Sequence, residues 1–580
     1  MTPRSRVVRA GATLAVALIF VFGVAAPPER CPTVTGAQLH ASAQAAVDWF
    51  ARNQHADGSW LYDYDARTDR AKPEYNVVRH TGAVEGLYQA AAAGLPRALD
   101  SADRGTEWAR DRLTTRDGWS TVFLGGEIPT GATALLVAGL DIRREATGDR
   151  RYDTLLRRLG RFLVAQTEPS GAVLASYDPI RDRPVRGEYS KYYTGETYWA
   201  LARLHLTFPG EGWGQVADRI GAYLATKRDD VEDHFPPIED HWAAYGLSST
   251  VQFPERGRPP LTADELHYAR SQAKLFGSET RYISQRMGPW GALVRGPHEP
   301  RGGGYGVMGE GLTGLWRTAL REPRLADLRG PMAERATCMA GLAIDAQSDA
   351  KEAAREKNPS RVEGAWFRDG ETRMDDQQHA LSALLRTQAI VRAGGGSDGP
   401  DDETPAAWMW ALILLLALNP IRAAFGIPRA PAEGDADPVR LALLGGAVGA
   451  LLVVAASALA PPLLDALDVS DPSFRTGAGI VAVLTGIADL FRRPPQTGPV
   501  PFPLVARPAL LILALGAGAD RGVLPSIVAM AIGIAALAGL VAAEAADGPR
   551  ARALRWAARL LAAGLIAGGV TLVIHGILDV

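Results

Sequence analysis

Cysteine is scarce in this chain of 580 residues. Only Cys31 and Cys338 are present, which excludes a disulfide-rich scaffold and a cysteine-based metal centre. One disulfide between them and two separate thiols both remain open. The net charge of −2 and the absence of a basic stripe interleaved with aromatic residues exclude a strongly basic nucleic-acid binder, so no nucleic-acid partner is expected.

Charged residues are sparse, and tyrosine is absent, in the last third of the chain. Residues 406–580 contain no lysine, no tyrosine, 12 arginines and 11 acidic residues. A helix needs roughly 20 apolar residues to cross a membrane. We expect a six-helix transmembrane domain at 406–580, preceded by a linker at 396–405. Six apolar segments fill this block: 406–426, 440–461, 474–491, 501–519, 523–545 and 554–578.

The N-terminus has the features of an export signal. Three arginines among the first nine residues precede an apolar run from Gly11 to Ala26, which ends in the small residues Val24-Ala25-Ala26. A basic region followed by an apolar run and small residues is typical of a secretory signal. Residues 1–26 are therefore expected to be either a cleaved signal peptide or a retained signal anchor.

The charges of the connections between the apolar segments alternate, which predicts a topology. Positive connections lie on the cytoplasmic side of a membrane, so the first span begins outside, as the export signal also requires. We expect a multi-pass protein of the cytoplasmic membrane, in contact with membrane lipids, with residues 36–400 on the extracytoplasmic side. The connections are positive at Arg422, Arg429 and Arg440, acidic at Asp465, Asp468 and Asp471, positive at Arg492 and Arg493, and positive at Arg550, Arg552, Arg555 and Arg559.

The polar part of the chain contains an internal repeat. Gln54, Gly58 and Trp60 recur in part as Gln166 and Gly171, and each copy leads to a helix start with a Thr-Gly pair. The apolar residues between these starts recur at three and four positions, which is typical of helices. We predict an all-α (α/α)6 toroid over 36–395, with an open solenoid of helix pairs as the rival. The six inner-helix starts are placed near residues 81, 130, 194, 242, 310 and 378, and outer helices at Ser42–Asn53, Arg104–Leu113, Tyr152–Gln166 and Trp213–Lys227.

The Gln54-x-x-x-Gly58-x-Trp60 motif resembles the QW turn of the terpenoid cyclase and prenyltransferase toroids. That resemblance implies a structural role for Trp60. The acidic and metal-binding motifs of those enzymes are absent, so polyisoprenoid cyclisation is the least favoured activity. The toroid also resembles six-hairpin glycosidases and sugar epimerases, which implies carbohydrate chemistry on the inner helices.

Polar and aromatic residues gather at the six inner-helix starts, which share one mouth of a toroid. Paired carboxylates suit acid and base catalysis on sugars, and aromatic faces stack on sugar rings. Asp240 is equally explained as a helix cap, and the histidines as hydrogen-bonded structural residues. No metal or cofactor is expected, because no HExxH spacing is present. The candidate catalytic residues are Glu196, Asp240, Glu310 and Asp376, and the candidate substrate-binding residues are His80, Tyr193, His241, Trp242, Tyr305, Trp366 and His379.

Two further features bear on function. The glycine-rich stretch Gly302–Gly309 predicts a tight turn at the rim of the ring. In the membrane block, the six apolar segments, an Asn-Pro pair in the first and Phe-Arg-x-x-Gly in the third resemble the MarC-type family of exporters. Charge and helix breaks inside spans are typical of transporters. The membrane-domain candidates are Asn419, Arg475, Asp489 and Arg507.

Together these patterns predict a membrane-tethered toroid that processes an envelope glycan or a lipid-linked saccharide at the outer surface of the cytoplasmic membrane. If it is an enzyme, it is of the glycosidase or epimerase type. The alternative is a non-catalytic toroid that binds a ligand for a MarC-like transporter domain.

Overall fold

The computed structural model describes residues 3–116, 118–234, 237–257, 259–296, 299–394, 405–425, 427, 437–467, 469–491, 507–543 and 551–579. It forms two compact units, which we call the ring unit (Cys31–Ser284 and Glu299–Asp401) and the membrane unit (Met1–Arg30, Gln285–His298 and Asp402–Asp579). Most of the expected linker and part of the fourth apolar segment lie outside the described residues. So do several connection charges used above: Arg429, Asp468, Arg492, Arg493 and Arg550.

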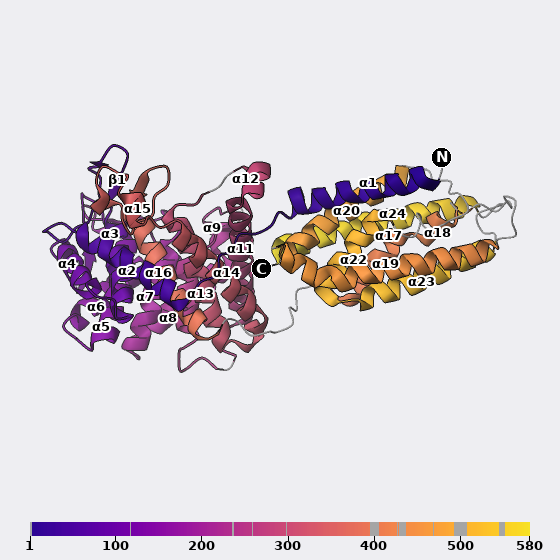
Figure 1. Cartoon of the computed structure of the whole chain (residues 1–580). Helices are drawn as coiled ribbons and strands as arrows, with labels where there is room; N and C mark the ends of the chain where they lie inside the picture. The colour runs from indigo at the N-terminus through magenta and orange to yellow at the C-terminus, as the bar shows by residue number, and fades with distance from the viewer. Residues whose placement is uncertain are drawn as a thin grey trace. The chain divides into compact units, whose positions relative to one another are not determined.

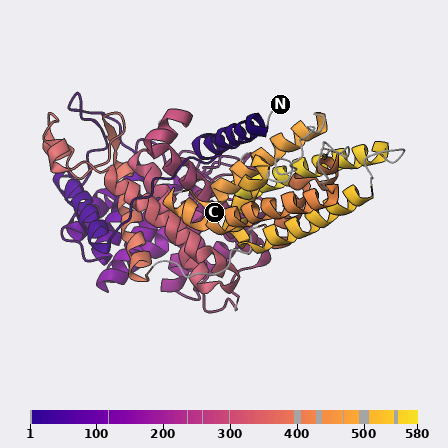
Figure 2. The ribbon, with the colours of Figure 1, turned by 45° about the vertical axis from the view of Figure 1, so that its right-hand side comes forward.

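Six inner helices close the ring unit on itself. Figures 1 and 2 show the helices of this unit from two directions. Each inner helix packs against the next, and the last, α16, returns to pack against the first, α3. The closed (α/α)6 toroid is therefore confirmed over the open solenoid. The inner helices are α3 (Val77–Ala92), α5 (Thr130–Thr147), α7 (Tyr193–Thr207), α10 (His241–Thr250), α13 (Gly302–Arg321) and α16 (Met374–Arg392).

Outer helices surround this inner ring. An outer helix such as α6 buries one face, with Leu156, Leu159 and Leu163 at helical spacing. An inner helix is buried all round: every residue of α5 from Thr130 to Arg143 is buried, as expected of a helix covered on all sides. The outer helices are α2 (Gly36–Arg52), α4 (Ala98–Arg110), α6 (Asp153–Gln166), α8 (Trp213–Thr226), α11 (Ala263–Met287) and α14 (Arg329–Asp345).

Short elements line the connections of the ring. Strands β2, β1 and β7 form a three-stranded antiparallel sheet in which Tyr64 lies opposite Thr372. Two hairpins, β3–β4 and β5–β6, lead toward α5 and α7. The bounds are β1 (Asp63–Asp65), β2 (Arg70–Ala71), β3 (Leu113–Arg116), β4 (Trp119–Val122), β5 (Tyr177–Asp178), β6 (Arg183–Pro184), β7 (Glu371–Arg373), α9 (Arg228–Val231) and α15 (Ala350–Ala353).

The turn that follows an outer helix occurs three times, once more than the sequence revealed. In the first copy the amide of Gln54 donates to Gly58 O at 3.0 Å, and Trp60 is 1% exposed. In the third copy the amide of Gln347 donates to Gly364 O at 2.8 Å. The backbones of Gln347 and Trp366 pair in an antiparallel β-bridge, as those of Gln54 and Trp60 do. Glycine is required because φ is +91° and +83° at Gly58 and Gly364, and a side chain there would strike the next outer helix.

The glycine-rich stretch is part of a helix, which corrects the predicted rim turn. Helix α13 begins at Gly302, eight residues before its expected start. A Cβ at Gly306 would lie 2.2 Å from the carbonyl carbon of His379 on α16. The absence of side chains therefore permits the close packing of α13 on α16.

One disulfide joins Cys31 to Cys338 on α14, with their Cα atoms 4.5 Å apart. Of the two alternatives left open by the sequence, the structure shows the bridged one. It ties the segment before α2 to the outer wall of the ring across 307 residues.

The membrane unit contains five helices that are long and apolar enough to cross a membrane, counting only the described part of the chain. The first of these spans is interrupted by Asn419, at φ +45° between α17 and α18. The fourth apolar segment appears as the shorter α22, and its residues 501–506 lie outside the description. The helices are α17 (Ala407–Leu418), α18 (Pro420–Ala424), α19 (Pro438–Ala466), α20 (Asp471–Phe491), α22 (Pro508–Arg521), α23 (Leu524–Ala542) and α24 (Ala551–Leu578).

The N-terminal segment is packed into this unit. Helix α1 (Pro3–Phe20) contacts α22, and the π-helical turn Val21–Ala25 contacts α20 and α12 (Pro289–Arg295). The Trp290 indole donates to Gly23 O at 2.9 Å, and Arg295 donates to Val24 O and Ala25 O at 3.0 and 2.8 Å. The small-residue site expected for cleavage is thus held by the short helix α12.

Candidate functional site

A cavity of about 510 Å³ opens where the inner helices of the ring begin. It is lined by residues from all six, which is possible because helix N-termini share one end of the toroid. Its walls combine aromatic rings with charged groups, as is usual for small-molecule sites. Its polar and aromatic lining residues include Arg79, Tyr192, Tyr193, Glu196, His241, Trp242, Arg301, Arg373, Asp375, Asp376, Gln378 and His379.

Two histidines from α10 and α16 face each other in this cavity. Their ring centroids are 5.0 Å apart and nearly perpendicular. Glu310 of α13, fully buried, lies between them: its Oε2 is 2.6 Å from His379 Nδ1 and 3.8 Å from His241 Nε2. Within the part of the chain that the structure describes, neither ring nitrogen of His241 has a hydrogen-bond partner, although the side chain is 2% exposed. Three sequence candidates that are far apart in the chain therefore form one cluster.

The surroundings shift the pKa values of the two imidazoles in opposite directions. Burial, and then the charge of His379, lowers the pKa of His241 well below its usual value of 6.5. Burial also acts against a charge on His379, but the carboxylate of Glu310 outweighs it and raises the pKa of His379. A pair of titratable groups with separated pKa values is the usual arrangement for a general base and a general acid.

Glu196 supplies a third titratable group at the cavity. Burial, and then the nearby Asp240, raises the pKa of Glu196 well above 4.5. Its Oε2 is buried without a hydrogen-bond partner. A protonated carboxyl here can donate a hydrogen bond to a ligand.

The other two candidate carboxylates are engaged by neighbours. Asp240 does not line the cavity: it caps α10 through Ala243 N at 2.9 Å and pairs with buried Arg228 at 2.6 Å. Asp376 lines the cavity, but it accepts from Arg301 Nη2 at 2.9 Å and from the backbone of Gly303 and Arg373. The four predicted carboxylates therefore do not converge as a free catalytic pair.

Two arginines at the mouth, Arg301 and Arg373, were absent from the predicted site. They come from the segments that precede α13 and α16, and no motif marks them, because only the closure of the ring brings these segments together. Arg79 also lines the mouth, where it pairs with Asp375 at 3.0 Å. Tyr193 and Trp242, which were predicted, do line the cavity.

Three predicted binding residues do not line this cavity. His80 is buried between the hydroxyl of Tyr75 at 2.7 Å and Gly105 O at 2.8 Å, and it stacks on Trp108. Trp366 is 1% exposed and donates to Ala343 O at 2.7 Å, in the position that Trp60 occupies in its own turn. Tyr305 is buried in the first turns of α13.

The histidine pair and Glu310 also have the composition of a metal site. One donor atom from each of His241, Glu310 and His379 lies within 4.8 Å of the other two. Two imidazoles and a carboxylate suit a divalent transition metal. His379 Nδ1, however, already makes a 2.6 Å contact with Glu310.

The four membrane-domain candidates lie in or beside two buried charge clusters of the membrane unit. Arg475 pairs with Asp520 at 2.7 Å and with Asp579. Asp489 pairs with Arg507 at 2.6 Å and with Arg422 at 3.2 Å.

Asn419 supports the second cluster, since its side chain caps α18 by accepting from Arg422 N at 3.1 Å. The rise of α20 separates Arg475 from Asp489 by about 21 Å, so the clusters lie toward opposite ends of that helix. All the charged members named here have a partner of opposite sign.

No protein-family model and no curated protein matches the sequence. In structure the chain is similar to a cellobiose 2-epimerase from Spirochaeta thermophila DSM 6192, at 12% identity over 66% of this chain and 98% of that chain, with a TM-score of 0.41. It is also similar to a glycoside hydrolase family 76 mannosidase from Bacteroides thetaiotaomicron VPI-5482 (12% identity, 61% and 99% covered, TM-score 0.41) and to a D-mannose isomerase (12%, 61% and 97%, 0.43).

Proposed function

We propose that the ring unit is a carbohydrate-active enzyme that moves a proton at the carbon beside the carbonyl of a reducing sugar, as an epimerase or isomerase does. The observation that carries this proposal is the facing pair of His241 and His379, whose pKa values are shifted apart at the wall of one cavity. General acid and base groups of this kind contribute roughly 10²–10⁴ to a rate.

Each histidine has one role in the reaction. Neutral His241 removes the proton from the carbon next to the carbonyl, and protonated His379, held by Glu310, donates a proton to the carbonyl oxygen. In this step the C–H bond and the π bond of the carbonyl break, an O–H bond forms, and the product is an enediol. When that hydroxyl gives its proton back to His379 and the same carbon is protonated on its other face, the carbonyl re-forms and the product is the epimer. When the neighbouring enediol hydroxyl loses its proton instead and the former carbonyl carbon is protonated, the product is the isomer.

The walls of the cavity suit a sugar. Tyr192, Tyr193 and Trp242 offer aromatic faces, and Trp242 packs against both histidines. Aromatic faces bind the apolar side of a sugar ring, and Glu196 and Arg79 provide donors for its hydroxyl groups.

A glycosidase is the second candidate, and one observation favours it. Glu196 is a buried carboxyl with a raised pKa, as the general acid of glycoside hydrolysis requires. Such an enzyme also needs a second free carboxylate, and Asp376 and Asp240 are both bound to arginines. A lipid-linked saccharide fits only this candidate, because its anomeric carbon is substituted and cannot open to a carbonyl.

We place the ring unit outside the cytoplasmic membrane, tethered by the spans. The Cys31–Cys338 disulfide supports this side, because disulfides persist in oxidising compartments. The paired charges in the membrane unit support an anchoring role for it. A ring that binds a ligand for a MarC-like transporter is the alternative function.

The proposal is tested on the full-length protein with a panel of reducing mono- and disaccharides. His241→Asn and His379→Asn should each lower kcat by about a hundredfold or more, whereas the control His40→Asn, on the exposed side of α2, should leave it unchanged. Turnover that survives both substitutions would contradict the proposal. Loss of turnover on removing metal with EDTA would instead assign His241, Glu310 and His379 to a metal centre.

A further inference from the structure

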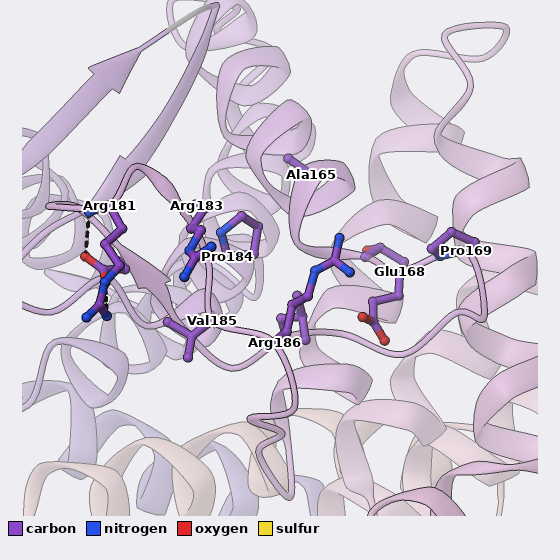
Figure 3. A pocket seen from close by; sticks show the side chains of 11 residues that line it. Ala165, Glu168, Pro169, Arg181, Arg183, Pro184, Val185 and Arg186 are labelled. Carbon is purple, nitrogen blue, oxygen red and sulfur yellow. Dashed lines mark hydrogen bonds and ion pairs between the residues drawn. The ribbon is translucent and has the colours of Figure 1, made fainter.

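A second cavity of about 830 Å³ lies in the ring unit beside the β5–β6 hairpin, and three of its lining residues are arginines. In Figure 3 Arg181, Arg183 and Arg186 follow one another along its wall, with Glu168 beyond Arg186. Leu174, Pro184 and Val185 add apolar surface. This cavity plays no part in the proton transfer proposed above.

The two acidic side chains of the hairpin, Asp178 and Asp182, already have hydrogen-bond and ion-pair partners. Asp178 accepts from the backbone of Ile180 and Arg181 at 2.9 Å each, and its other oxygen binds the Arg181 guanidinium at 3.1 Å. Asp182 is bound by Arg116 and by the hydroxyl of Tyr177. Neither acid is left to neutralise the remaining arginines.

Two guanidinium groups at the cavity therefore have no partner. Within the described residues, neither the guanidinium of Arg183 nor that of Arg186 makes a hydrogen bond or an ion pair. The one other acid in the lining, Glu168, accepts from Tyr189 at 3.5 Å. A guanidinium fork matches the geometry of a carboxylate or phosphate, and such charge-assisted bonds are among the strongest hydrogen bonds in proteins.

The backbone here is fixed by the ring. Thr130 N at the start of α5 donates to Ala175 O at 3.0 Å, and Ala175 N donates to Glu188 O at 2.8 Å. The chain then runs from Arg186, in this cavity, to Ser190, in the histidine cavity. Four peptide units span at most about 14 Å, so a short oligosaccharide can reach both cavities.

We propose that this arginine cavity binds a carboxylate or phosphate group carried by a saccharide chain whose reducing end enters the histidine cavity. The saccharide nature of the ligand rests on the proposed function, and the anion site does not. The guanidinium groups supply the charge contact, and the apolar wall meets the faces of the sugar rings.

The test is equilibrium binding to the full-length protein of a uronic-acid trisaccharide, its neutral counterpart and inorganic phosphate. Arg183→Ala combined with Arg186→Ala should weaken binding of the uronate by about tenfold or more, because both charged hydrogen-bond donors are removed. The control Arg181→Ala, whose guanidinium is held by Asp178, should change it little. Affinity for the neutral trisaccharide should not depend on these arginines.

Three outcomes overturn the proposal: uronate binding that is unchanged in the double variant, equal arginine dependence for the neutral sugar, or phosphate that binds as tightly as the uronate, which would indicate a site for a free anion. Binding is measured without turnover. A failure of the anion site and a failure of the proposed chemistry therefore give different results.

Discussion

Glu310 Oε2 lies 2.6 Å from Nδ1 of His379, although the two residues are 69 positions apart in the sequence. Burial lowers the pKa of His379, but this contact with Glu310 raises it by more. The contact also makes α13 part of the site on α10 and α16.

The pH profile should reveal this contact. His379 must be protonated to act as the acid, so activity should fall as pH rises through its raised pKa, above 6.5. Glu310→Gln removes the charge that raises the pKa of His379, so the alkaline limb of the kcat profile should move to lower pH. The acid limb reflects His241, which stays neutral until pH falls well below 6.5. An alkaline limb that does not move in the variant would remove Glu310 from this role.

Trp60 and Trp366 should behave alike. Each is 1% exposed in the same turn, and truncation of a buried tryptophan typically costs ~3–5 kcal/mol. Trp60→Ala and Trp366→Ala should both lower the melting temperature of the protein clearly, whereas Phe123→Ala, at a site that is 38% exposed, should not. A Trp366→Ala protein that keeps its stability and loses sugar affinity would place Trp366 at the binding site instead.

The N-terminal helix should be retained in the mature protein. The carbonyls of Gly23, Val24 and Ala25 are bound by Trp290 and Arg295, and Ala26 is fully buried, so a peptidase cannot reach the bond after Ala26. Intact-mass spectrometry of the membrane-extracted protein should show residues 1–26. A chain beginning at Pro27 would contradict this, and Trp290→Ala with Arg295→Ala should increase cleavage.

The side of the membrane on which the ring unit lies can be tested by labelling the cysteines of its disulfide. Cys338 is 2% exposed, so it should react with an impermeant thiol reagent added to intact cells with an opened outer envelope only after reduction of its bond to Cys31 and mild denaturation. A reporter fused after Arg493 should read as cytoplasmic, because positive connections face that side. Labelling without reduction would show that the bridge is absent, and an extracytoplasmic reporter would reverse the topology.

Much of the ring was predictable because its signals are local. Thr-Gly pairs begin α5 and α7 at or within one residue of the positions expected, since helix starts depend on neighbouring residues. The start of α13 was misplaced because glycines usually mark turns, and only the packing of α13 against α16 explains why they are helical here. The third turn was missed because Gly364 follows Gln347 by 17 positions, whereas Gly58 follows Gln54 by four.

The sequence predicted which residue types form the site, but not which of those residues lie together in space. His241, Glu310 and His379 were all candidates, but sequence spacing cannot show that three helices bring them together. Arg228 forms an ion pair with Asp240, so Asp240 is not a free catalytic carboxylate. Arg228 lies on the short helix α9, and no sequence motif marks it. Long-range partners of this kind depend on the closed ring.

The most direct test of the proton-transfer chemistry is solvent exchange at the substrate. The full-length protein is incubated in D₂O with a reducing sugar that it converts, and the product is read by NMR. Wild type should place deuterium on the carbon beside the carbonyl, and His241→Asn should not. Conversion with no deuterium at that carbon in any sugar, or release of cleaved saccharide instead, would contradict the assignment of His241 and His379 as base and acid.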